Sequence, residues 1–256
     1  MKRLSRSLTI YIALAITLAI LAALNVFLPQ GQFSSLLPEQ ELPAPKPVMA
    51  LVSAVIMLVL YGGLGLIGLV LSRKLCFPDI WDDKISNRQR FLVPMLIGAG
   101  LGILFIIVDT IVGRLHPLGA LPHPPFPTSL VASATAGIGE EIIFRLFFIS
   151  FWVWLISHVI LRNRGQSLVF GVVATLSGLV FALGHLPSVM LLYGLTQVNQ
   201  VPLTLLGEIL LLNGALSFLA AYSWKKYGFL AAIGIHFWTD VVWHVVWGAI
   251  LLQVLQ

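Results

Sequence analysis

Three ionisable side chains lie inside one apolar segment of the sequence, where charges are rare. Glu140, Glu141 and Arg145 are the only Asp, Glu, Lys or Arg residues between positions 129 and 160. An ionisable group at membrane depth is costly, and it usually faces the interior of a helix bundle or a water-filled cavity. The cluster therefore predicts a functional site, with an ion pair that only locks two spans together as the alternative.

The spacing of these residues divides their roles. Glu141 and Arg145 are four residues apart, so they share one face of a helix and can pair. Glu140 points about 100° round the helix from Glu141. We therefore expect Arg145 to neutralise Glu141, whereas Glu140 needs partners from other helices.

Histidines occur in two further apolar segments. His185 lies near the end of one, a position that is typical of an interfacial or packing residue. His236, Asp240 and His244 recur every four residues and line one stripe of a helix. His and Asp at this spacing suit a zinc site, and they suit a hydrogen-bonded polar seam equally well.

Two more carboxylates, Asp109 and Glu208, lie in apolar segments without a partner four residues away. They can pair with Arg145, bind a cation or a proton, or support the site by contacting the residues that form it.

Composition indicates a membrane protein of the all-α class. Of the 256 residues, 59% are hydrophobic and 10% are charged, against roughly 25% charged in soluble domains. The mean hydropathy is +0.98. The net charge of +5 reflects basic residues in loops and predicts no binding of nucleic acid. One cysteine, Cys76, excludes an intramolecular disulfide, and we expect it to be buried.

Apolar runs of about 20 residues mark the helices that must position these groups. The runs predict spans near residues 8–28, 48–72, 91–113, 128–160, 167–186, 203–224 and 228–254. The fourth run is about 48 Å long as one helix, which exceeds a hydrocarbon core of about 30 Å. It therefore either protrudes into water or breaks near Arg145, which gives seven or eight membrane helices.

Basic residues in the loops predict the orientation of the bundle. Twelve lie on one side of the predicted spans and two on the other. The twelve are Lys2, Arg3, Arg6, Arg73, Lys74, Lys84, Arg88, Arg90, Arg162, Arg164, Lys225 and Lys226, and the two are Lys46 and Arg114. The N-terminus is accordingly expected in the cytoplasm and the C-terminus outside. The membrane is the plasma membrane if the source is prokaryotic.

Three short patterns on separate apolar helices follow one another in a recognisable order. They are Glu-Glu-x-x-x-Arg at 140–145, Phe-x-x-x-His at 181–185 and His-x-x-x-Asp at 236–240. Together they resemble the CPBP family of intramembrane proteases, which includes CAAX prenyl endopeptidases and bacteriocin self-immunity proteins. The resemblance covers roughly residues 125–250. It divides the chain into N-terminal helices and loops, residues 1–124, without a family match and a protease core, residues 125–256.

The resemblance implies an all-helical bundle with a catalytic site inside the membrane. Glu140 corresponds to the family's essential glutamate, and Glu141 with Arg145 completes that motif. His185 is the histidine of the second motif. His236 and Asp240 fill the third, whose last position is often Asn.

Peptide hydrolysis needs an activated water, a stabilised oxyanion and a proton for the leaving amine. In a metal-free version, Glu140 aided by His185 is the base, and His236 with residue 240 donates to the oxyanion. An ionised Asp240 cannot donate, so it must be protonated or orient His236. In a metal version, Glu140, His185 and His236 bind zinc or another divalent ion, with Asp240 as a ligand or behind one.

The resemblance therefore predicts an intramembrane endopeptidase that acts in the lipid bilayer on a peptide, or on a membrane-associated or lipidated protein. The alternatives are a transporter or channel that uses Glu140, Asp109 and Glu208, and an inactive scaffold or immunity protein. Counting from the assumed span ends, His185 lies roughly 10 Å nearer the outer surface than Glu140 and His236. These groups meet only if the fifth helix tilts or lies deeper than assumed.

Overall fold

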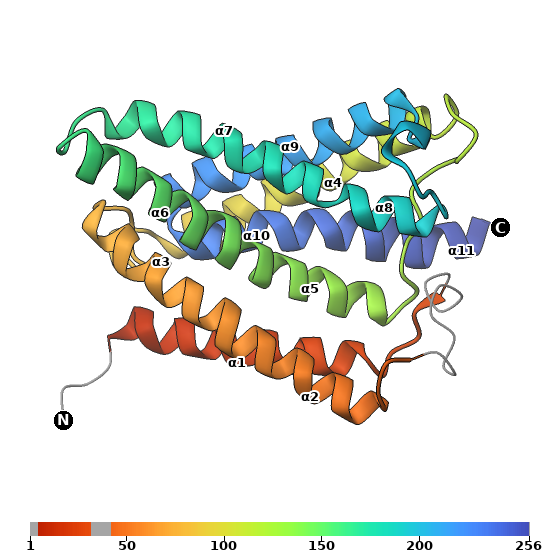
Figure 1. Ribbon diagram of the computed structural model, residues 1–256, viewed down its shortest axis with the longest axis horizontal. Helices are drawn as coiled ribbons and strands as arrows, with labels where there is room; N and C mark the ends of the chain where they lie inside the picture. The colour runs from red at the N-terminus through yellow and green to blue at the C-terminus, as the bar shows by residue number, and fades with distance from the viewer. Residues whose placement is uncertain (1–4, 32–41, 256) are drawn as a thin grey trace.

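The computed structural model describes residues 5–31 and 42–255 of the chain. Within these residues the fold is a bundle of helices without strands (Figure 1). Lys2 and Arg3, two of the basic residues that predict the orientation, lie outside the described residues.

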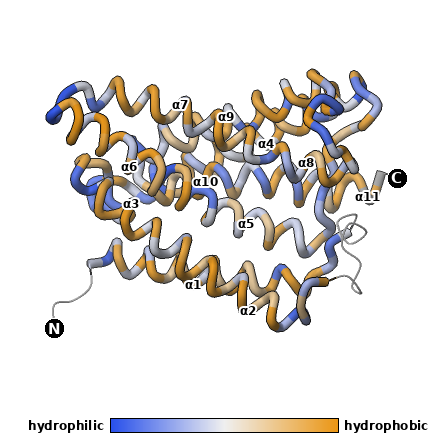
Figure 2. Tube along the Cα trace, viewed as in Figure 1, coloured by the Kyte–Doolittle hydropathy of each residue, from blue (hydrophilic) through white to orange (hydrophobic). Residues whose placement is uncertain are grey.

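Seven helices in the described part are long and apolar enough to cross a bilayer, as the hydropathy of the trace also shows (Figure 2). The chain therefore folds as a multi-pass integral membrane protein of the all-α class. The seven are Arg6–Asn25, Lys46–Lys74, Arg88–Val112, Thr128–Ile160, Gln166–Leu192, Leu203–Tyr227 and Phe229–Leu251.

Several of these helices consist of consecutive α and π segments. The α-helices are α1 (Arg6–Asn25), α2 (Lys46–Ile56), α3 (Gly62–Lys74), α4 (Val93–Val112), α5 (Thr128–Glu141), α6 (Ser150–Val153), α7 (Gln166–Gly184), α8 (Leu186–Leu192), α9 (Leu203–Tyr227), α10 (Phe229–Asp240) and α11 (Leu252–Leu255). The π-helical segments are Met57–Tyr61, Arg88–Leu92, Ile142–Ile149, Trp154–Ile160 and Val241–Leu251, and a 3-10 turn spans Val198–Gln200.

The fourth span continues through Arg145 without a break. It changes at Ile142 from α- to π-helical geometry, immediately after the two glutamates. Single π turns inside α-helices are frequent at functional sites. The predicted break into two helices is therefore wrong, and the described spans number seven.

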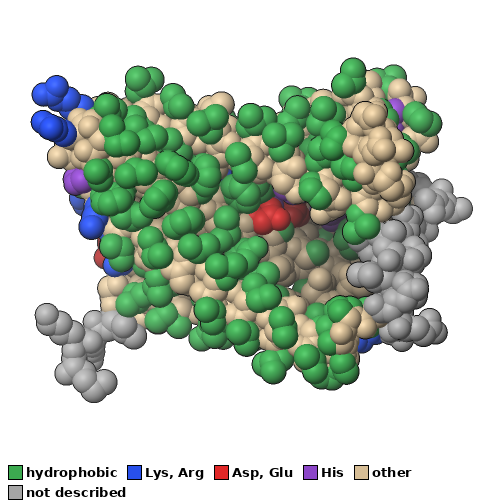
Figure 3. Space-filling model, in the orientation of Figure 1, with side chains coloured by type: hydrophobic (Ala, Val, Ile, Leu, Met, Phe, Trp, Pro, Cys, Tyr) green, Lys and Arg blue, Asp and Glu red, His purple; other side chains and the backbone are tan. Residues whose placement is uncertain are grey.

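The two ends of the bundle differ in charge. The start of α1 and the end of α11 lie at opposite ends of its long axis (Figure 1). Lys and Arg side chains gather at the end where α1 begins (Figure 3). The turns at this end follow α3, π segment Trp154–Ile160 and α9. The charge asymmetry of the sequence thus corresponds to an asymmetry between the two ends of the fold.

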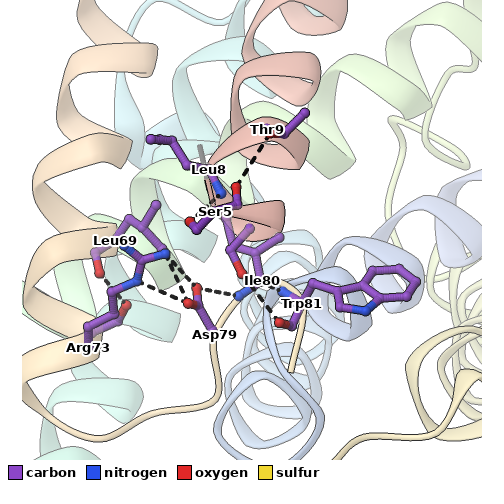
Figure 4. Close-up of polar contacts among 10 residues, drawn as sticks. Ser5, Leu8, Thr9, Leu69, Arg73, Asp79, Ile80 and Trp81 are labelled. Atoms are coloured by element: carbon purple, nitrogen blue, oxygen red, sulfur yellow. Dashed lines mark hydrogen bonds and ion pairs between the residues drawn. The ribbon is translucent and has the colours of Figure 1, made fainter. Parts of the chain in front are cut away.

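The loop between α3 and α4 closes this basic end (Figure 4). Arg73 Nη2 lies 2.9 Å from Asp79 Oδ2. The Ser7 hydroxyl accepts a hydrogen bond from the backbone N–H of Trp81 at 3.0 Å, which ties the loop to α1. Cys76 in the same loop is exposed, so the prediction of a buried thiol is wrong. The loop lies at the helix ends, outside the packed interior.

Glycines bring α4 and α10 into close contact. A Cβ on Gly98 would lie 2.5 Å from the carbonyl oxygen of Ile235, and one on Gly102 would lie 2.7 Å from that of Thr239. Small residues four apart allow membrane helices to approach this closely. Thr239 Oγ1 also lies within hydrogen-bond distance of the Gly98 carbonyl oxygen, at 3.2 Å. The third span thus fixes α10, the helix that contains His236 and Asp240.

Candidate active site

The two glutamates lie where α5 packs directly on α10. Gly137 makes this approach close, because a Cβ there would lie 3.2 Å from the Cβ of Phe237. Glu140 and Glu141 follow Gly137 by about one helical turn. They therefore reach His236, which precedes Phe237 on α10.

Glu141 bridges Arg145 and His236. Its Oε2 lies 3.1 Å from Arg145 Nε, which confirms the predicted i,i+4 pair. Its Oε1 lies 2.8 Å from Nδ1 of His236. An ionised carboxylate only accepts hydrogen bonds, so Nδ1–H of His236 donates to Glu141 and the ring is held in one orientation. Glu141 is therefore more than the neutralised half of an ion pair.

Arg145 is fully enclosed. Its side chain is 0% exposed, and its guanidinium carbon lies 4.8 Å from the centre of the Phe181 ring. A buried guanidinium needs a compensating charge, and an aromatic face adds a favourable contact. Glu141 and Phe181 together provide both.

The second nitrogen of His236 lies between two further carboxylates. Nε2 is 3.7 Å from Glu140 Oε2 and 3.6 Å from Asp240 Oδ2. The side chain of Glu140 is 34% exposed and that of Asp240 is 12% exposed. Acidic side chains are visible beside a hollow near the middle of the face that Figure 3 shows. Glu140 is thus the most accessible member of this group.

Glu140 has an unused acceptor. Its Oε2 is buried yet has no hydrogen-bond partner among the described residues. Buried polar atoms without a partner are uncommon in folded proteins and call for a missing partner, such as a water molecule. The atom therefore marks a position where a polar group can bind between Glu140 and His236.

His185 lies at the junction of α7 and α8, next to Phe181. Its Nδ1 lies 2.8 Å from the Phe181 carbonyl oxygen, so Nδ1 donates and Nε2 is the acceptor. The Phe181 ring lies 4.8 Å from the His185 ring and 5.8 Å from the His236 ring, centre to centre. No hydrogen bond or ion pair joins His185 to Glu140 within the described part of the chain. The fifth span continues to Leu192, whereas the sequence placed its end near residue 186.

The polar stripe of α10 continues into π segment Val241–Leu251, where His244 contacts His123 from the loop between α4 and α5. Nδ1 of His244 lies 2.9 Å from Nδ1 of His123. Gly248 leaves room for the His123 ring, since a Cβ there would overlap it. Burial lowers the pKa of His123 to about 4, so the imidazole is neutral and can share one N–H with His244. The loop between α4 and α5 therefore packs into the bundle.

Asp109 and Glu208 are buried carboxylates on α4 and α9. Asp109 Oδ1 accepts a hydrogen bond from the Leu121 backbone N–H at 2.8 Å, so Asp109 anchors the loop before the fourth span. Arg145 pairs with Glu141 instead. Within the described residues, no ion pair joins Arg145 to Asp109 or Glu208.

The donor set fits a metal ion poorly as it is arranged. In a tetrahedral zinc site, with bonds of about 2.0–2.2 Å, all ligand atoms converge on one point. Within residues 5–31 and 42–255, no three His, Cys, Asp or Glu side chains are arranged to hold a metal ion. His185, one of the proposed ligands, contacts Phe181, and no hydrogen bond or ion pair joins it to Glu140 or His236 in the described part of the chain. The free acceptor of Glu140 therefore fits a water molecule better than it fits a metal centre.

Comparison with known families identifies the segment that contains these groups. Residues 122–242 match the family model described as type II CAAX prenyl endopeptidase Rce1-like. Through this segment the chain belongs to the CPBP family. No curated protein and no solved structure matches the chain significantly. The matched segment contains all three motifs. Because the CPBP family is a family of proteases, the match supports a peptidase activity.

Two features of this CPBP site were not evident in the sequence. The contact of Glu141 with His236 depends on how α5 packs against α10, and no local spacing encodes it. The N-terminal helices, which precede the matched segment, also reach the site: the Tyr61 ring packs against Gly139, next to Glu140. An aromatic residue with a hydroxyl in an unmatched span gives no signal by itself.

Proposed function

We propose that the chain is an intramembrane endopeptidase in which Glu140 activates a water molecule. The observation that carries this proposal is the unpartnered Oε2 of Glu140, which lies 3.7 Å from Nε2 of an oriented histidine. A carboxylate with a free lone pair inside a bundle is a suitable general base. The family match of residues 122–242 supports the reaction class.

The proposed reaction uses the contacts around His236. Glu140 takes a proton from the water, and the oxygen of that water attacks the carbonyl carbon of the substrate. The resulting oxyanion accepts a hydrogen bond from Nε2–H of His236, which two carboxylates at 3.6 and 3.7 Å favour as a cationic donor. Protonated Glu140 then gives the proton to the leaving amine, and the peptide bond breaks.

The remaining motif residues support these steps. Glu141 holds the His236 ring through Nδ1 at 2.8 Å, in the way a carboxylate orients a catalytic histidine. Asp240 lies beside Nε2 and stabilises its positive charge. His185 has an acceptor nitrogen available, and we assign it to the substrate side of the site, next to Phe181.

A metal-dependent version of the reaction makes a different prediction. Zinc or another divalent ion would need Glu140, His236 and His185 or Asp240 to converge. A chelator, 1,10-phenanthroline, should leave the activity of the purified protein unchanged if the water is held by Glu140 alone. Loss of activity that added Zn²⁺ restores would instead establish the metal-dependent version.

The proposed substrate is a membrane-associated or lipidated peptide or protein. Glu140 lies near the middle of the fourth span, and its side chain is 34% exposed. Acidic side chains border the hollow that Figure 3 shows. A transporter that uses Glu140, Asp109 and Glu208 would need these carboxylates on one route. Asp109 instead anchors a loop through its hydrogen bond from Leu121, and this observation favours the protease.

The decisive experiment compares the proteomes of host cells that express the wild type or the Glu140→Gln variant. Glutamine keeps the shape of the side chain and removes the base. The variant should accumulate at least one uncleaved membrane-associated precursor that the wild type cleaves.

A matched control is Asp83→Asn, which removes an exposed carboxylate in the loop after α3. This variant should process the precursor normally. Normal processing by Glu140→Gln, at wild-type protein levels, would show that the proposed function is wrong and would favour transport or a scaffold role.

A further inference from the structure

The site as described lacks a second donor for the oxyanion. His236 can offer only Nε2–H, because Nδ1–H is bound to Glu141 at 2.8 Å. Asp240 lies next to Nε2 at 3.6 Å, and an ionised carboxylate has no proton to donate. Oxyanion sites are built from convergent donors, and the loss of one typically costs about 100-fold or more in rate. A second hydrogen-bond donor to the oxyanion must therefore come from another group in the bundle.

Tyr61 lies in the right part of the molecule. It is the last residue of π segment Met57–Tyr61 in the second span. Its Cε1 lies 3.5 Å from where a Cβ on Gly139 would be, so its ring packs on α5 one residue before Glu140. The ring of Tyr61 therefore lies beside the residue that precedes the proposed base.

The Tyr61 backbone is fixed while its hydroxyl stays free. The Tyr11 hydroxyl donates to the carbonyl oxygens of Tyr61 and Gly62. The Leu18 side chain packs against the same face of Gly139. Within the described residues, no hydrogen bond involves the Tyr61 hydroxyl, and the side chain is only partly buried. A positioned phenol with an unused O–H next to Glu140 is available to a substrate.

We propose that the Tyr61 hydroxyl donates a hydrogen bond to the substrate carbonyl oxygen as that atom becomes the oxyanion. It takes the place of the amide donor that Asp240 cannot provide. This inference rests on the proposed peptidase function. It also assigns a catalytic residue to the N-terminal helices, which lie outside the matched segment 122–242.

The test measures cleavage by purified protein of an internally quenched peptide that spans the cleavage point of the precursor. Tyr61→Phe removes only the hydroxyl. We expect kcat to fall about 100-fold with little change in KM, because the bond strengthens only in the transition state. Tyr222→Phe, which removes an exposed hydroxyl on α9, should leave both constants unchanged.

A second variant separates this role from a structural one. Asp240→Asn provides an amide N–H donor next to His236 Nε2. In that background the effect of Tyr61→Phe should shrink to less than about 10-fold, because another donor is present. Thermal unfolding in detergent should give the same midpoint for wild type and Tyr61→Phe.

Three outcomes would overturn the inference. One is wild-type kcat for Tyr61→Phe while Glu140→Gln is inactive, which would leave the peptidase function intact. The second is an undiminished effect of Tyr61→Phe in the Asp240→Asn background, and the third is an inactive Asp240→Asn protein. If Glu140→Gln cleaves normally, the proposed function fails and this inference fails with it.

Discussion

Glu141 makes two contacts, and variants of its neighbours can separate their effects on stability and on activity. It neutralises Arg145 through Oε2 at 3.1 Å and holds His236 through Oε1 at 2.8 Å. Arg145 has no water-facing surface, since its side chain is 0% exposed. A charge in such a place depends entirely on its partner.

Arg145→Met should therefore destabilise the protein by about 3–5 kcal/mol, because it leaves Glu141 buried without its counter-charge. The double variant Glu141→Leu, Arg145→Met should recover most of that loss, since both charges disappear together. The free energy of unfolding in mixed micelles measures both effects. The double variant should still be inactive, as His236 then lacks its orienting carboxylate. Equal stability of Arg145→Met and wild type would contradict a structural role for the ion pair.

These residues also show what the sequence could predict. The pair of Glu141 with Arg145, and the proximity of His236 to Asp240, follow from a spacing of four on one helix. The contact of Glu141 with His236 joins residues 95 positions apart. It depends on the close approach at Gly137, which helical spacing cannot reveal.

The end of the fifth span differs from the prediction. The sequence predicts an end near residue 186, but α8 continues the span to Leu192. The depth of His185 was counted from that assumed end. The N-terminal spans gave no motif, yet α4 and Tyr61 both border the site, because helix packing in a bundle does not follow motif boundaries.

The contact between α4 and α10 is a property of whole helices, and it positions the third motif. Gly98 lies against the Ile235 carbonyl and Gly102 against that of Thr239. These two residues directly precede His236 and Asp240. Any side chain at these glycines must push the helix axes apart.

Gly98→Ala should lower stability by about 1–3 kcal/mol, the usual cost of overpacking. It should also reduce kcat, because α10 moves together with His236. Gly100→Ala on the same helix is the matched control, since nothing lies within 4 Å of a Cβ there. Unfolding midpoints and peptide cleavage measured on both variants test the prediction. If both alanines behave alike, the close contact does not position the site.

The charge asymmetry of the bundle predicts its orientation, and with it the position of the site relative to the two sides of the membrane. Lys and Arg gather at the end where α1 begins (Figure 3). By the positive-inside rule we expect this end to face the cytoplasm. The loop that contains Cys76 belongs to that end, and the 3-10 turn Val198–Gln200 follows α8 at the other.

The exposed Cys76 offers a direct test of this orientation, because it is the single cysteine of the chain. A membrane-impermeant maleimide should label Cys76 in inverted vesicles and leave it unlabelled in intact cells. The double variant Cys76→Ser, Asn199→Cys should show the opposite pattern, since Asn199 is exposed at the other end. Labelling of Cys76 in intact cells would reverse the bundle. It would then place the basic end, which holds ten of the thirteen Lys and Arg residues that the structure describes, outside the cell, against the usual distribution of charge.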